Sequence, residues 1–294
     1  MKKLIPSLTL LALLAAACST PPISDTGPVI LASHSILADV AREIAGNTVA
    51  IEPIIPDGVD THSYQPTPQD IARISNADLV ITNGFGLEPW MQTVIQEEGF
   101  SGTVVEATSG LQPMMETQDE TDPHFWMDPI LMMQAASNIE KGLSSLLPEN
   151  KDLYASNLGA YTAELKSLDE WIRQVVSEIP IEHRLIVTNH HTLGYFAQQY
   201  GFTVAGTILE GTSSESGLSS KHLQDLINLI IAKEIPVIFI EPTDDANIAE
   251  QIKEETGVRI ETGLNTHSLK INGTQISYLE MVKQDVELLR SLGE

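Results

Sequence analysis

The feature of this 294-residue sequence that most constrains its fold is a repeated alternation of short apolar runs with segments of helical periodicity. Short apolar runs bounded by turn residues are typical of buried strands, and strands that alternate with helices build mostly parallel sheets. We therefore expect the α/β class, with two Rossmann-like lobes. The expected strands are residues 29–33, 49–55, 78–82 and 103–106 in the first lobe, and 185–188, 203–207, 237–240 and 258–261 in the second.

A stretch without strand patterns separates these two halves. One helix opens at Asp128 and ends at Pro148, and a second apolar stripe at helical spacing runs from Glu149 to Ile179. A continuous helix of that length would extend ~46 Å at ~1.5 Å per residue. Such a segment indicates a rigid linker helix between the lobes rather than a flexible hinge.

The N-terminus has the pattern of an export signal. Two lysines precede an apolar run from Leu4 to Ala17, which is shorter than the ~20 residues that span a bilayer and fits a secretory signal peptide. The run ends in three alanines directly before Cys18, the single cysteine of the chain, as in a bacterial lipoprotein cleavage box. We expect Cys18 to be lipidated and the protein to be held on the cell envelope; an ordinary signal peptide with an incidental cysteine is the alternative.

These patterns define an expected domain organisation. It consists of a signal peptide over residues 1–17, a tether over 18–27, an N-terminal lobe over 28–148, the linker helix over 149–180 and a C-terminal lobe over 181–294.

Charge and cysteine content exclude several functions. Sixteen basic and 40 acidic residues give a net charge of −24, which argues against a nucleic-acid partner because such proteins need a basic face. Removal of residues 1–17 takes away two lysines and no acid, so the mature chain would carry −26. A single cysteine excludes a disulfide framework and a multi-cysteine metal site.

Three of the eight histidines stand in loops beside expected helix starts, where α/β sheets bind ligands. His62 follows the second strand, His124 lies between two Asp-Pro pairs, and His190 lies between a strand and a helix of the second lobe. Together they could hold a metal ion, since imidazole is a common zinc ligand. A single loop histidine is more often exposed or hydrogen-bonded, and the spacing matches no compact metal motif.

Longer motifs around these histidines carry a family resemblance. Residues 57–71 (DGVDTHSYQPTPQDI), 122–129 (DPHFWMDP) and 187–202 (VTNHHTLGYFAQQYGF) resemble the three ligand motifs of the zinc/manganese family of ABC-transporter solute-binding lipoproteins. Further similarities lie in order at residues 153–157, 238–242 and 255–258, so the resemblance covers residues 28–292.

The resemblance implies a function and a site. It implies two α/β lobes joined by the linker helix, one metal ion in the cleft between them, and delivery of that ion to a membrane permease and its ATPase. His62, His124 and His190 match ligand positions. His191 stands where the family usually has an acid, so we expect it to contact the ligands from behind or to lie at the rim of the site. We expect a monomeric carrier that is not an enzyme.

The fourth ligand position departs from the family. The family usually places an aspartate on the last loop, shortly after a strand and two residues before a leucine. In the segment Ile260–Leu264 that register falls on Thr262, a poor zinc ligand, with Glu261 one residue earlier. The expectation is that Glu261 reaches the metal or that water completes the site.

The expected cargo is zinc, with manganese next, because imidazole suits zinc and harder oxygen ligands suit manganese. A zinc-dependent hydrolase is an alternative, because three histidines with an open position also describe a catalytic zinc and Glu261 or Glu210 could act as the base. A surface adhesin is a second alternative.

Overall fold

The structure is a computed structural model that describes residues 27–97, 99–115, 120–210, 217–241, 246–271 and 273–293. The predicted signal peptide, Cys18 and the tether up to residue 26 lie outside the described residues. Within the described part of the chain, no helix combines the length and the hydrophobicity that a membrane crossing requires.

The N-terminal lobe is built on a four-stranded parallel sheet, as the sequence predicts. Its strands are β1 (Ile30–Ala32), β2 (Ile51–Pro53), β3 (Leu79–Thr82) and β4 (Thr103–Glu106), in the order β2-β1-β3-β4. The central strands β1 and β3 are buried along their whole length, which explains their continuous apolar sequences.

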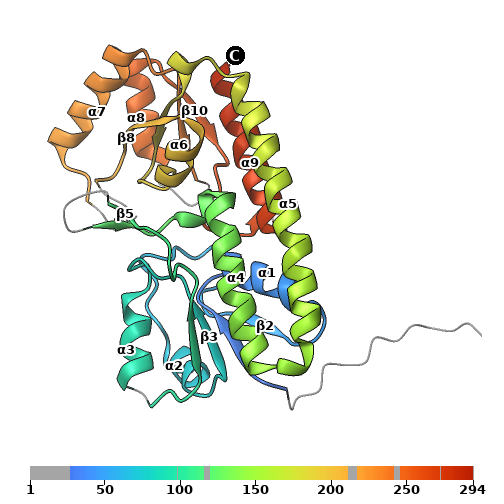
Figure 1. The fold of residues 1–294 in the computed structure, drawn as a ribbon. Helices are drawn as coiled ribbons and strands as arrows, with labels where there is room; N and C mark the ends of the chain where they lie inside the picture. The colour runs from blue at the N-terminus through green and yellow to red at the C-terminus, as the bar shows by residue number, and fades with distance from the viewer. Residues whose placement is uncertain are drawn as a thin grey trace, which may run out of the picture.

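Helices cover both faces of this sheet (Figure 1). Because successive side chains of a strand point to opposite faces, Leu79 and Ile81 pack in the core with α1 (Ser35–Ala45) and α4 (Pro129–Leu146). Val80 packs on the other side, in the cluster that includes residues of α2 (Pro68–Ser75) and α3 (Pro89–Glu97).

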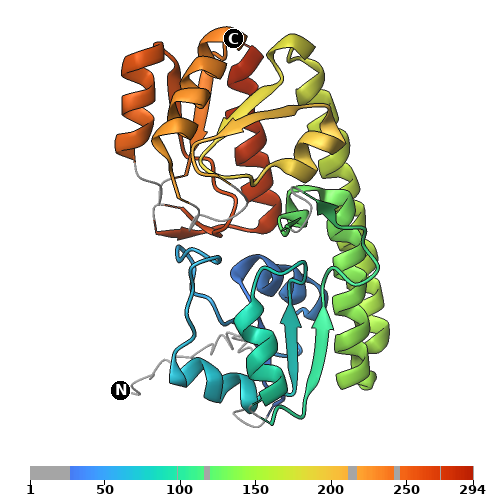
Figure 2. The ribbon, with the colours of Figure 1, turned by 90° about the vertical axis from the view of Figure 1, so that its left-hand side faces the viewer.

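The C-terminal lobe repeats the pattern. Parallel pairs form between β7 (Leu185–Thr188) and β8 (Thr203–Thr207) and between β9 (Val237–Ile240) and β10 (Arg259–Thr262), and β7 lies beside β9. The helices of this lobe include α6 (Gly194–Tyr200), α7 (Ser220–Lys233) and α8 (Ala246–Thr256) (Figures 1 and 2). The expected α/β class with two lobes is confirmed.

The linker helix α5 (Lys151–Ser177) runs along both lobes beside α9 (Tyr278–Leu289) (Figure 1). Its 27 residues correspond to ~40 Å. The helix is shorter than the predicted span of 149–180 because residues 148–150 form a 3-10 turn after Pro148 and the α-helix ends at Ser177. One continuous apolar core includes residues of α5, of the first sheet and of the second lobe, so the lobes are packed as one unit.

Two short hairpins were not predicted from the sequence, and both adjoin the site described below. They are β5 (Met114–Met115) with β6 (Thr121–Asp122), and β11 (Lys270–Ile271) with β12 (Thr274–Gln275). Strands of two residues are too short for a period of two to be visible in a sequence.

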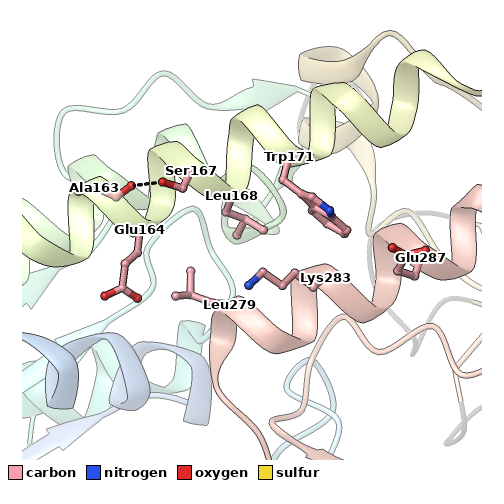
Figure 3. Close-up of a pocket in the computed structure, with 8 residues that line it drawn as sticks. All are labelled: Ala163, Glu164, Ser167, Leu168, Trp171, Leu279, Lys283 and Glu287. Carbon is pink, nitrogen blue, oxygen red and sulfur yellow. Dashed lines mark hydrogen bonds between the residues drawn. The ribbon is translucent and has the colours of Figure 1, made fainter.

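A groove of about 670 Å³ lies between α5 and α9 (Figure 3). Trp171, Leu168 and Leu279 supply its apolar surface, and the ammonium of Lys283 projects into the space between the two helices. No histidine lines this groove, so it is separate from the cluster described next.

Candidate metal centre

Four histidines of the described residues come together at the junction of the two lobes. They are His62, His124, His190 and His267, and each offers one ring nitrogen such that these atoms all lie within 4.8 Å of one another. The structure thus brings together the three histidines that the sequence singled out and adds a fourth.

Each histidine lies on a loop at the end of a strand or beside a hairpin. His62 follows β2, His124 follows β6, His190 follows β7, and His267 lies between β10 and β11. The first two come from the N-terminal lobe and the other two from the C-terminal lobe. This placement agrees with the rule that α/β sheets bind ligands beyond the carboxyl ends of their strands.

The ring nitrogens converge at the spacing of metal ligands. The Nε2 atom of His124 lies 3.1 Å from Nε2 of His62 and 3.1 Å from Nε2 of His267. Two nitrogens bound at ~2.05 Å to one tetrahedral zinc ion would be ~3.3 Å apart. A small outward movement of these rings would therefore admit an ion of that size.

A local turn orients His62. Asp60 accepts hydrogen bonds from the backbone N–H of His62 (3.1 Å) and from the Ser63 hydroxyl (2.5 Å). Such an Asx turn fixes the backbone of a loop that has no regular structure. The loop thereby presents the imidazole of His62 to the other lobe.

Asp122 orients His124. Its Oδ1 atom accepts hydrogen bonds from the backbone N–H of His124 (2.9 Å) and from the ring Nδ1 (2.8 Å). Burial alone would raise the pKa of Asp122, but its contacts with His124 and His191 lower it to about 2. Because the carboxylate can only accept, Nδ1 of His124 carries the hydrogen and the lone pair of Nε2 faces the cluster.

Glu241, directly after β9, has the same relation to His267. Nδ1 of His267 lies 3.1 Å from Oε1 of Glu241, which also accepts a hydrogen bond of 2.5 Å from the Thr266 hydroxyl. Burial would raise the pKa of Glu241, but the charge and hydrogen bond of His267 lower it to about 2.

The N-terminal lobe holds the loop that carries His267. The indole Nε1 of Trp126 donates a hydrogen bond to the carbonyl of Thr266 (2.7 Å), and Asp57 accepts one from the backbone N–H of Leu269 (3.1 Å). The last loop of the C-terminal lobe is therefore fixed against the same lobe that supplies His62 and His124.

Burial favours the neutral form of three of these imidazoles, those of His62, His124 and His190. Desolvation, with the neighbouring histidines as the second cause, lowers the pKa of His190 to about 3 and lowers that of His62 further. Burial also lowers the pKa of His124, although Asp122 opposes the shift. Neutral imidazole is the form that binds a metal ion, so burial holds these three rings in the form that a metal requires.

The structure does not bring Glu261 to this cluster, contrary to the expectation that it reaches the site, and places His267 there. Glu261 lies on β10, where its carboxylate is 3.1 Å from Nε of Arg259, and Thr262 is exposed at the end of the strand. His191 lies beside the cluster, with Nδ1 3.6 Å from Oδ2 of Asp122. The sequence held a signal for His267: it too precedes a leucine by two residues, five positions after Thr262.

These features define a class of protein: two α/β lobes joined by a long helix, with a cluster of four histidines from both lobes that could hold a metal ion. The profile of a family described as "Zinc-uptake complex component A periplasmic" matches residues 30–292. The chain belongs to this family and is a substrate-binding protein of a metal ABC transporter, a component that works with a permease and an ATPase.

Known relatives cover almost the whole chain. The manganese-binding lipoprotein MntA of Halalkalibacterium halodurans is 31% identical over 98% of this chain and 97% of its own length. The periplasmic zinc binding protein TroA from Treponema pallidum superimposes with a TM-score of 0.84 at 28% identity, over 90% of this chain and 99% of that one. A mutant of the laminin-binding adhesin Lmb from Streptococcus agalactiae gives a TM-score of 0.83 at 26% identity, over 91% and 100%.

Proposed function

We propose that this protein captures a divalent transition-metal ion outside the cytoplasm with His62, His124, His190 and His267 and delivers it to its permease. The observation that carries the proposal is the convergence of four ring nitrogens within 4.8 Å. Four imidazoles satisfy the coordination number of zinc, which is usually bound by four ligands.

The donor set favours zinc over manganese as the cargo. Imidazole nitrogen is a good ligand for zinc, whereas manganese prefers carboxylate, carbonyl and water oxygens. All four members of the cluster offer nitrogen and none offers oxygen. The neighbouring carboxylates of Asp122 and Glu241 contact the Nδ1 atoms of His124 and His267, on the side of each ring away from the cluster. Relatives are named for both metals, so we propose zinc first and manganese second.

A competition titration tests the metal and the ligands together. The metal-free protein is titrated with zinc in the presence of a chromophoric chelator, and with manganese separately. We expect the wild type to bind one equivalent of zinc. His267→Ala removes a ligand and should weaken zinc binding more than ~100-fold, which is the upper limit for mutation of residues that only contact a ligand. The matched control is Glu261→Ala, which removes a carboxylate paired with Arg259 and should leave the zinc affinity unchanged.

Two results would contradict the proposal. If Glu261→Ala lost zinc affinity and His267→Ala did not, the fourth ligand would be wrong. If the wild-type protein took up no transition metal, the proposed cargo would be wrong.

The geometry favours a carrier over a hydrolase. Both acids that the sequence offered as a catalytic base contact other groups: Glu261 pairs with Arg259, and Glu210 accepts a hydrogen bond from Ser219. Neither belongs to the histidine cluster. We therefore propose that the zinc-loaded protein has no ester-hydrolysing activity above that of free zinc, which a chromogenic ester assay measures.

We further propose that Cys18 is lipidated and holds the mature, monomeric protein at the outer face of the membrane. Relatives are named lipoproteins, and Cys18 follows three alanines at the end of the apolar run. Stable anchoring takes two acyl signals, which lipoprotein processing supplies. Cell fractionation tests this: Cys18→Ala should move the protein from the membrane fraction to the soluble fraction, and unchanged membrane association would contradict the anchor.

A further inference from the structure

We propose that Asp122 and Glu241 are positioning residues that make His124 and His267 the anchoring pair of the metal site. Each carboxylate holds the Nδ1–H of one histidine, aims its Nε2 at the metal and offsets part of the cation's charge. The inference rests on the proposed function, because it concerns how the same site holds its metal.

The environment of Asp122 is closed on every side. Its side chain is fully buried, and its backbone carbonyl accepts a hydrogen bond of 3.0 Å from the Tyr195 hydroxyl of the other lobe. A Cβ atom at position 194 would lie 2.4 Å from Oδ2 of Asp122, so Gly194 allows the two lobes to close around this carboxylate. A buried carboxylate that contacts a ligand histidine is costly unless a cation balances it.

Glu241 is built into the opposite side of the cluster. Only 7% of its surface is exposed, and its Oε1 atom receives the Thr266 hydroxyl while Nδ1 of His267 lies 3.1 Å away. The Thr266 oxygen is also 2.8 Å from Nδ1 of His267. These three groups form a closed triangle that leaves His267 one orientation, with Nε2 toward His124.

The other two histidines differ in this respect. In the part of the chain that the structure describes, neither ring nitrogen of the buried His190 has a hydrogen-bond partner, and the His62 ring packs against the rings of the other three histidines. The two carboxylates therefore place negative charge next to the Nδ1 atoms of His124 and His267. The anchored half and the unanchored half of the site should therefore contribute unequally to affinity.

The experiment uses variants that remove charge but keep hydrogen-bond acceptors. In Asp122→Asn and Glu241→Gln the amide oxygen can still accept from Nδ1, so a loss of affinity reports on the charge. The matched control is Asp169→Asn, a buried carboxylate bonded to Tyr200 and Arg173 and to no histidine. Zinc affinity is measured by chelator competition on the full chain, the Co²⁺ visible spectrum reports the ligand set, and the melting temperature of the metal-free protein reports folding.

We expect Asp122→Asn and Glu241→Gln each to weaken zinc binding 10–100-fold while the Co²⁺ spectrum keeps its four-coordinate form, and Asp169→Asn to bind as the wild type does. If Asp122→Asn fails to fold, Gly194→Ala displaces the same carboxylate without removing its charge and should weaken binding in the same direction. Affinities of the two charge variants within threefold of the wild type, or an equal loss in Asp169→Asn, would overturn the inference. If instead the wild-type chain binds no zinc, the proposed function fails and the inference falls with it.

Discussion

His34 gives a sharp test of how completely the junction between the lobes is buried. This histidine is not one of the four clustered residues, but its ring packs 5.1 Å from that of Trp126 and its Nε2 lies 3.3 Å from Oδ1 of Asn83. The amide nitrogen of Asn83 donates to the carbonyls of Gly84 and Pro123, so its oxygen faces His34 and Nε2 of His34 is the donor. Burial lowers the pKa of His34 from 6.5 to about 4.

The sign of the effect follows from proton linkage. Between pH 6.5 and about 4 the unfolded chain binds a proton at His34 and the folded chain does not, so acidification through this window lowers the free energy of unfolding. At ~1.4 kcal/mol per pH unit, His34 should cost the folded state about 2 kcal/mol between pH 7 and pH 5. Well above pH 6.5 His34 is neutral in both the folded and the unfolded chain, so it no longer lowers the free energy of unfolding.

The assay compares the metal-free wild type with His34→Gln by urea denaturation at pH 7, 6 and 5. Glutamine can still donate to Asn83 but cannot titrate, and all other groups cancel in the difference between the two proteins. We expect the wild type to lose about 2 kcal/mol more than the variant over this range. If the difference in the free energy of unfolding between the two proteins stays constant with pH, His34 is not desolvated. That result would refute the burial of His34 at the junction between the lobes.

Two further predictions concern packing. Tyr278→Phe removes a buried hydroxyl that donates a hydrogen bond to the carbonyl of Trp126 at 2.6 Å. The change should lower the free energy of unfolding, measured by urea denaturation, by ~1–3 kcal/mol. An unchanged midpoint would contradict this link between α9 and the first lobe. Gly142→Ala would place a Cβ atom 2.3 Å from Cγ2 of Val105 and should destabilise the protein by ~1–3 kcal/mol. Gly159→Ala lies on an open face of α5 and should stabilise the protein by up to ~1 kcal/mol. Equal effects of the two changes on the melting temperature would refute the close approach of α4 to β4.

The sheets were predictable because their signal is local. The strands β3 and β9 are continuous apolar runs that are buried on both faces, and a sequence shows this directly. The linker helix was predictable from its apolar spacing, but its first turn was not, because Pro148 starts a 3-10 turn before the α-helix.

The site was predictable only in part because its geometry is not local. His62, His124 and His190 could be selected from the motifs around them, whereas His267 was not considered for the fourth position. Which of the two leucine-containing segments, Ile260–Leu264 or His267–Leu269, reaches the cluster is decided by tertiary structure. The position of the His267 loop depends on the hydrogen bond from Trp126 to Thr266 and on the β11–β12 hairpin that follows the loop. Neither feature produces a periodic pattern in the sequence. The partnership of Glu241 with His267 likewise joins residues 26 positions apart.

The central claim is that four histidines, and no carboxylate, hold the metal. A crystal structure of the zinc-loaded protein, with data collected at the zinc absorption edge, tests it most directly. We expect one anomalous peak bonded at ~2.0–2.1 Å to one ring nitrogen each of His62, His124, His190 and His267. Asp122 and Glu241 should still contact the Nδ1 atoms of His124 and His267. A peak bound by Glu241 or Glu261 in place of His267, or a metal located outside the four-histidine cluster, would contradict it.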